Sequence, residues 1–163
     1  VAERYPDAHF ILIGRDVCLE NIDLTKNIPS KLHAKFHFLG ERRDVACLMS
    51  TMDVLCLSSL WGEGFPNVLG EAMAANVPCV ATDIGDSKFV IGDCGVVVAP
   101  GNTEGLATGI ESLFELSVSE RQQLGGRARN RIEDKFILNA IVEKYTALYI
   151  KITSEKKKDL CVA

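Results

Sequence analysis

The chain has 163 residues, 47% hydrophobic and 25% charged, and a formal net charge of −4. These values are ordinary for a globular domain and exclude a disordered chain, a fibre and a collagen. No apolar run approaches the roughly 18 residues of a membrane span, and the acidic balance lacks the basic footprint of a nucleic-acid-binding protein.

Short apolar runs alternate with helical patterns along the first hundred residues. A continuous apolar run that ends in a turn residue is typical of a strand buried in a parallel sheet. Apolar residues three and four positions apart predict helices between these runs. The predicted strands cover residues 9–14, 35–40, 53–58, 78–83 and 95–99, and the predicted helices cover a polar stretch broken at Pro29, residues 43–52 and about 67–76.

Three further helices are predicted after the last strand. Asn102 is expected to cap the first, and Ser119 with Gln122 resembles a capping box for the second. The adjacent Gly125 and Gly126 are expected to weaken the second helix by about 2 kcal/mol. The third helix presents one apolar face, formed by Ile141, Tyr145, Leu148, Tyr149 and Ile152.

This order predicts an α/β fold, a Rossmann-like parallel sheet with helices on both faces. We interpret residues 1–155 as a single partial domain and residues 156–163 as a charged tail, with a solvated role favoured over a contact with an anionic membrane. The six cysteines include no C-x-x-C pair, so no zinc ribbon or redox motif is predicted. The sequence shows no signal-peptide pattern and no N-x-S/T sequon, so a reduced cytosolic setting is expected. Cys56 and Cys79 lie within apolar strands and are predicted to be buried.

Ligands of parallel sheets bind beyond the carboxyl ends of the strands, and the stretch after residue 58 is rich in suitable groups. A glycine-rich turn, Gly62 to Gly64, allows close approach of the backbone to a ligand. Pro66 suits a first helical position. The amides of Asn67 and Val68 then lack intrahelical partners and, with the helix dipole, form an anion site.

Two carboxylates, Glu63 and Glu71, flank this predicted anion site. Carboxylates repel phosphate, so they are expected to face hydroxyl groups instead. A diphosphate flanked by hydroxyl-rich rings is a nucleotide sugar. Outside this setting, Glu63 would be read as a solvated loop residue and Glu71 as a helix-surface residue.

The same stretch resembles the C-terminal half of retaining glycosyltransferases of the GT-B fold, the group 1 or family 4 class. Glu63 and Glu71 match the E-x7-E motif of that family, within GEGFPN-x-x-x-EAMA. The segments YPDAHFILIGRD, FHFLGERRDV, DVLCLSS and PCVATDIGDSKFVIGDCGVVVAPGN resemble the units around it. The likeness runs from about residue 5 to residue 149.

The resemblance implies roles for individual residues. Glu63 would contact hydroxyls of the donor sugar as the catalytically important residue, and Glu71 would accept hydrogen bonds from the ribose hydroxyls. Backbone around Gly64 and Pro66 belongs to the same donor site, and the amides near Phe65, Asn67 and Val68 would hold the sugar and the distal phosphate. The nucleotide cleft would be lined by Gly14, Arg15, Gly40, Glu41 and Arg42.

The implied activity is transfer of a sugar, with retained anomeric configuration, from a nucleoside diphosphate, with UDP expected, to an acceptor hydroxyl in polysaccharide or glycolipid synthesis. No cofactor or metal is expected, because the chain has no D-x-D motif to hold Mg²⁺. Helix dipole, amides and cations would stabilise the leaving group. The expected location is cytoplasmic, with a peripheral contact at the inner face of the membrane.

The sequence departs from the family pattern in several places. No G-R-x-x-x-x-K segment precedes Tyr5, so the first strand and helix of the domain, with their diphosphate-binding Arg and Lys, are expected to be missing, and so is the acceptor-binding N-terminal domain. The missing strand would be central, and the chain alone is expected to be inactive. Gly85-Asp86 replaces a more common Gly-Gly. Two alternatives stay open: a truncated module that only binds nucleotide sugars, and a nucleotide-sugar 2-epimerase.

Overall fold

The five strands form two separate parallel sheets in a computed structural model that describes the backbone of residues 1–160 and the side chains of residues 1–154. In the first sheet β1 pairs with β2, and in the second β4 lies between β3 and β5. All five predicted strands are confirmed, each shorter than predicted. They are β1 (Phe10–Leu12), β2 (Phe36–Phe38), β3 (Leu55–Leu57), β4 (Cys79–Thr82) and β5 (Gly95–Val98).

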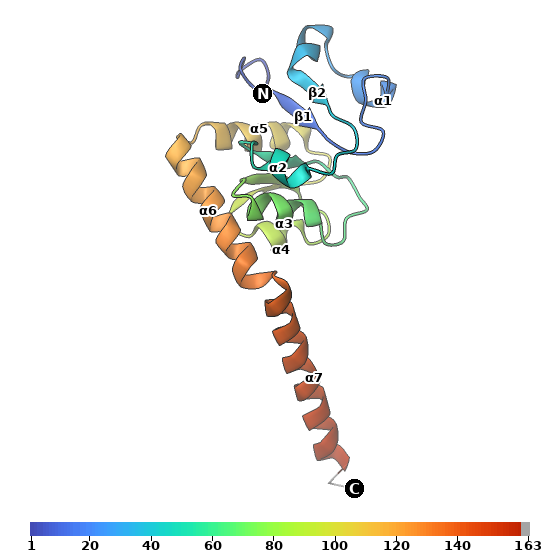
Figure 1. Cartoon of the computed structure of the whole chain (residues 1–163), viewed down its shortest axis with the longest axis vertical. Helices are drawn as coiled ribbons and strands as arrows, with labels where there is room; N and C mark the ends of the chain where they lie inside the picture. Colours follow the sequence, from blue (N-terminus) through green and yellow to red (C-terminus); the bar gives the residue numbers. More distant parts are fainter. Residues whose placement is uncertain (161–163) are drawn as a thin grey trace.

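Helical segments follow every strand, which confirms the predicted α/β class (Figure 1). Pro29 separates two short helical segments, as predicted. One helix, α4, was not predicted, because its five residues are too few to display a helical period. The helices are α1 (Ile22–Thr25), η1 (Ser30–Lys35), α2 (Val45–Met49), α3 (Asn67–Ala74), α4 (Ser87–Ile91), α5 (Thr103–Phe114), α6 (Val118–Lys135) and α7 (Leu138–Leu160).

The hydrophobic core is centred on β4, whose four residues are all buried. Helix α3 packs Leu69 and Met73 into this core, and α4 adds Ile91. Burial raises the pKa of the Cys79 thiol to about 12, so Cys79 is a neutral packing residue, as predicted.

The predicted parallel strands are confirmed, but they form two sheets rather than one, and parts of them are exposed. The side chain of Ile11 in β1 is 38% exposed, and Cys56 in β3 is exposed, contrary to its predicted burial. The reason is that β1 and β3 each pair on one side only. A doubly wound sheet has its first strand in the centre, between the second and the fourth. If that strand were absent, the second and third strands would form one sheet and the fourth, fifth and sixth another. These are the neighbours observed for β1 with β2 and for β3, β4 and β5.

Helix α6 holds several other elements in place. The Arg121 guanidinium donates to three carbonyls at the end of α5, and Arg131 donates to the carbonyls of Val90 and Phe89 at the end of α4, at 2.8 and 2.6 Å. These arginines satisfy carbonyl groups that have no partner within their own helices.

We expect Arg131→Met to lower the free energy of unfolding by about 2 kcal/mol, because it removes two hydrogen bonds from a charged donor. Arg129→Met is the matched control, since in the described part of the chain Arg129 pairs only with Glu133, on the exposed face of the same helix. This change should alter stability by less than about 0.5 kcal/mol. Urea unfolding curves measure both. Equal midpoints for the two variants would contradict this role of Arg131.

Two predictions about the last helices need correction. The capping box of α6 is formed by Ser117 and Glu120, not by Ser119 and Gln122, because Ser117 is the extended residue that precedes the first turn. Gly125 is more than a weak point in α6: it is buried against the Asn76 carbonyl, where an added Cβ would overlap the oxygen. Asn76 itself has a φ of 62°, the left-handed conformation that asparagine tolerates at the end of a helix. The Asn102 cap of α5 is confirmed.

Helix α7 continues beyond α6 and runs away from the rest of the chain (Figure 1). Its predicted apolar face lies largely in solvent, with Tyr145 56% and Tyr149 61% exposed. Of the predicted tail 156–163, the backbone is helical as far as Leu160, and residues 161–163 lie outside the described part. Among the described helices, none combines the length and hydrophobicity needed to cross a membrane.

Candidate functional site

The loop after β3 carries Glu63, and a chain of side-chain hydrogen bonds fixes it. The Ser59 hydroxyl donates to Glu63 Oε1 at 2.7 Å. The carbonyl of Ser59 accepts a hydrogen bond of 2.6 Å from Thr82 Oγ1, at the end of β4. Thr82 is only 1% exposed and Glu63 is half-buried. The Glu63 carboxylate is therefore linked to the buried core of the second sheet.

The turn between β4 and α4 packs directly against the same loop. The amide of Asp86 donates to the carbonyl of Gly64 at 2.8 Å. Gly85 has a φ of 55°, and a Cβ added there would overlap the Gly64 carbonyl oxygen and lie 2.5 Å from that of Glu63. Such close backbone packing is open only to glycine.

Helix α3 begins immediately behind Glu63. Pro66 is the N-cap residue rather than the predicted first helical residue, and its carbonyl accepts from the Leu69 amide. Within the described residues, the amides of Asn67 and Val68 have no hydrogen-bond partner, as predicted. Two free N–H groups and the positive end of the helix dipole can therefore bind an anion here.

The side chains next to these amides differ in burial. The Phe65 ring packs on Phe136, with centroids 5.6 Å apart, and Phe65 remains 44% exposed. Pro66 is buried. Glu71 lies in the second turn of α3 with its side chain exposed, and in the described part of the chain its carboxylate makes no hydrogen bond or ion pair.

The predicted nucleotide residues gather at the carboxyl ends of β1 and β2. The Gly14 amide donates to the Gly40 carbonyl at 2.9 Å, which brings the two loops together. Arg15 and Glu41 are exposed beside them. Arg42 donates to both carboxylate oxygens of Asp44 at 2.8 and 2.6 Å, and this guanidinium lowers the pKa of the Asp44 carboxyl.

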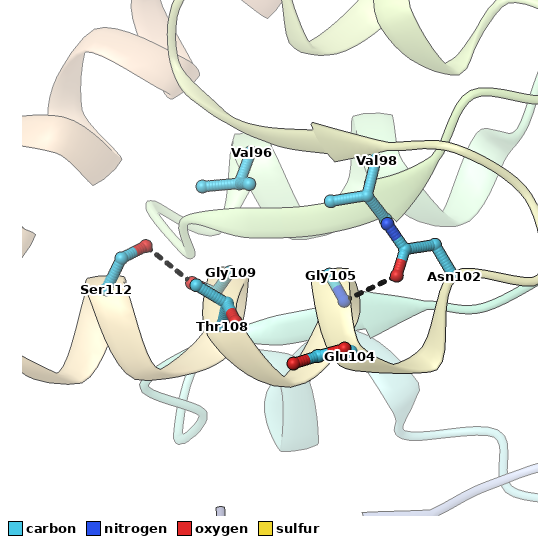
Figure 2. Close-up of a pocket in the computed structure, with 8 residues that line it drawn as sticks. All are labelled: Val96, Val98, Asn102, Glu104, Gly105, Thr108, Gly109 and Ser112. Atoms are coloured by element: carbon cyan, nitrogen blue, oxygen red, sulfur yellow. Dashed lines mark hydrogen bonds between the residues drawn. The ribbon is translucent and has the colours of Figure 1, made fainter.

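The site therefore consists of two groups, one on each sheet, and no hydrogen bond or ion pair between described residues joins them. The larger of two described cavities, about 460 Å³, lies elsewhere, between β5 and α5 (Figure 2). It contains neither Glu63 nor Glu71, and its lining comes from one strand, one turn and one helix face. The lining residues are Val96, Val98, Asn102, Glu104, Gly105, Thr108, Gly109 and Ser112.

The residues that support Glu63 cannot be recognised from the sequence pattern. Ser59, Thr82 and Gly85 are common residue types in unremarkable positions, and their link to Glu63 depends on β3 and β4 lying side by side. By sequence alone, the Gly85-Asp86 pair is only a departure from the more common Gly-Gly. Among the described residues, no three His, Cys, Asp or Glu side chains are grouped as metal ligands would be. Metal-free chemistry stays a prediction.

Solved structures with this architecture define the class as GT-B glycosyltransferases. A glycosyltransferase from Rickettsia africae ESF-5 superimposes with a TM-score of 0.76 at 26% identity, over 90% of this chain and 40% of that one. The Anabaena protein HepE, solved in complex with UDP, gives a TM-score of 0.75 at 24% identity, over 90% of this chain and 42% of its own.

Sequence comparison identifies the family. Residues 1–115 match the family described as glycosyl transferases group 1, and the chain belongs to this family. The N-acetyl-alpha-D-glucosaminyl L-malate synthase of Bacillus anthracis is 33% identical over 93% of this chain and 39% of its own length. The phosphatidyl-myo-inositol mannosyltransferase of Mycolicibacterium smegmatis is 33% identical over 69% of this chain and 29% of its own. The chain thus spans about two fifths or less of these relatives.

Proposed function

We propose that this chain is the donor-binding part of a glycosyltransferase that takes a sugar from a nucleoside diphosphate, with UDP as the expected carrier, and passes it to an acceptor hydroxyl with retained anomeric configuration. The observation that carries the proposal is the start of α3, where two amides without a partner in the described structure, those of Asn67 and Val68, follow the half-buried Glu63 by four and five residues. The amides suit a phosphate and the carboxylate suits sugar hydroxyls, and a nucleotide sugar carries both kinds of group.

The donor sugar is proposed to lie against the loop after β3. One oxygen of Glu63 accepts from Ser59, and the other has no partner among the described residues. That second oxygen is free to accept a hydrogen bond from a sugar hydroxyl. The amides of Asn67 and Val68 would bind the distal phosphate as its charge develops during cleavage, without a metal ion.

The nucleoside is proposed to lie between the two groups of the site. Glu71 is an exposed carboxylate without a partner in the described structure. Both of its oxygens are therefore free to accept hydrogen bonds from the two ribose hydroxyls. The loops at Gly14 and Gly40 would contact the base through their backbone, because the Arg42 side chain is already paired with Asp44. Arg15 is an exposed cation that could reach phosphate.

The acceptor is proposed to be a glycan or glycolipid. The Mycolicibacterium relative is by name a mannosyltransferase of phosphatidyl-myo-inositol, which supports this choice and a peripheral contact with a membrane. Because the chain spans about two fifths or less of such relatives, the acceptor site is proposed to lie on segments outside it. The chain alone is then proposed to bind a donor without transferring its sugar.

Thermal unfolding in the presence of UDP, GDP, ADP or UDP-sugars tests the proposal. A bound ligand at about 100 times its Kd should add roughly 2.7 kcal/mol to stability. We expect a rise in Tm with one nucleoside diphosphate, and loss of that rise in Glu71→Ala. Glu133→Ala, on the exposed face of α6, is the control and should keep the shift. No shift with any of these nucleotides in the full-length protein would contradict the proposed function.

A further inference from the structure

The position of Glu63 depends on residues that belong to a different strand and a different turn. Thr82, at the end of β4, donates to the Ser59 carbonyl at 2.6 Å, and Ser59 in turn donates to Glu63 at 2.7 Å. The Thr82 hydroxyl is buried, and a buried hydroxyl without a partner is costly. The hydroxyl also lies 3.5 Å from the Leu57 carbonyl, and its shorter hydrogen bond to the Ser59 carbonyl favours the observed position of the loop.

The backbone beside Glu63 is held in a second way. The Asp86 amide donates to the Gly64 carbonyl at 2.8 Å, which brings the turn after β4 to van der Waals distance of the loop. Only a residue without a Cβ can occupy position 85, because a Cβ there would overlap the Gly64 carbonyl oxygen and approach that of Glu63 to 2.5 Å. Any larger residue must displace either the turn or the loop.

The turn is the more firmly fixed of the two. It connects β4, which is buried throughout, to α4, whose Ser87, Val90 and Ile91 are buried. The loop, in contrast, exposes Leu60, Trp61 and Phe65 by 53, 79 and 44%. A side chain at position 85 is thus expected to displace the loop, and Glu63 with it.

We propose that Gly85 and Thr82 are positioning residues, which hold the free oxygen of Glu63 where it meets the donor sugar. The proposal rests on the proposed function for the identity of the ligand, but the positioning of Glu63 can be measured without any ligand. Neither residue touches the sugar. Gly85 acts by allowing the turn after β4 to pack against the backbone of the loop. Thr82 acts through its hydrogen bond to Ser59, which in turn donates to Glu63.

Hydrogen exchange of the full-length protein tests the positioning directly. In Gly85→Ala and Thr82→Val, the Asp86 amide, which donates to the Gly64 carbonyl, should exchange about tenfold faster than in the wild type, with no change over residues 10–40. Gly101→Ala is the matched control: Gly101 also has a positive φ, of 74°, but its added Cβ would meet only the Leu60 side chain at 3.8 Å. Unchanged exchange in both test variants would overturn the proposal. If Gly85→Ala fails to fold, the exchange measured for Thr82→Val alone decides between the two outcomes.

Kinetics then test the consequence. With UDP-glucose or UDP-N-acetylglucosamine as donor, kcat should fall about 100-fold in Gly85→Ala, the effect of misplacing a reacting group by about 1 Å. The Kd for UDP should stay within twofold, since Glu71 and the first sheet are untouched. An equal loss of UDP binding, or an unchanged kcat, would overturn the positioning role. A wild type that binds no UDP would contradict the proposed function instead, and the exchange measurement would still decide how Glu63 is held.

Discussion

Replacing Gly125 with alanine is expected to lower the free energy of unfolding by about 3 kcal/mol. Gly125 lies in the middle of α6, and α6 packs on α3 at this point, against the Asn76 carbonyl. The added methyl group would overlap that oxygen, so α6 must move away from α3. Because a small domain is stable by only about 5–15 kcal/mol, this loss is a large share of the total. Chemical denaturation followed by circular dichroism measures it.

The adjacent glycine provides the control. An added Cβ at Gly126 would meet no atom within 4 Å. Gly126→Ala should therefore show only the gain in helix propensity, about 1 kcal/mol of added stability. Two neighbouring and chemically identical substitutions are thus expected to have opposite signs. If both raised stability, the contact between α6 and the Asn76 carbonyl would not be the close one described.

Replacing Glu63 with glutamine is expected to reduce sugar transfer by about 100-fold in the full-length protein, on the proposed function. Glutamine can still accept the hydrogen bond from Ser59 through its carbonyl oxygen, so the loop should keep its position. The other oxygen becomes an NH₂ group, which cannot accept a hydrogen bond from a sugar hydroxyl. A lost hydrogen bond to a charged group costs about 1.5–3 kcal/mol, and the lost charge adds to this in the transition state.

Steady-state kinetics with a nucleotide-sugar donor measure this effect. Glu133→Gln, an isosteric change on the exposed surface of α6, should leave both kcat and stability unchanged. The Tm of Glu63→Gln should also match the wild type, which separates loss of function from loss of folding. If Glu63→Gln kept the kcat of the wild type, Glu63 would have no catalytic role and would be an ordinary loop carboxylate.

The sequence predicted the strands and the start of α3 well because these depend on local features. The apolar runs at residues 9–14 and 78–83 specify strands, and Pro66 followed by Asn67 specifies where a helix begins. The unpaired amides of α3 follow from helix geometry alone. The resemblance to glycosyltransferases depended on the motif around Glu63 and Glu71, and the family match confirms it.

Features that depend on contacts between distant segments could not be predicted. Cys56 and Cys79 occupy similar apolar runs, yet one is exposed and the other buried, because β3 has a neighbour on one side and β4 on both. The sequence alone predicts that Gly125 weakens its helix. Its packing against Asn76, 49 positions earlier in the chain, is evident only from the structure. The support of Glu63 by Thr82 likewise exists only once β3 and β4 are paired.

The division of the strands into two sheets means that the site belongs to two cooperative units. The β1–β2 ladder is half-exposed, whereas β4 is buried throughout, so the first sheet is expected to open at a lower free energy than the second. The loops proposed to contact the nucleotide lie on the unit expected to be less stable, and Glu63 and Glu71 lie on the other. A ligand that contacts both would couple their opening, so its binding energy would also serve to join the halves of the domain.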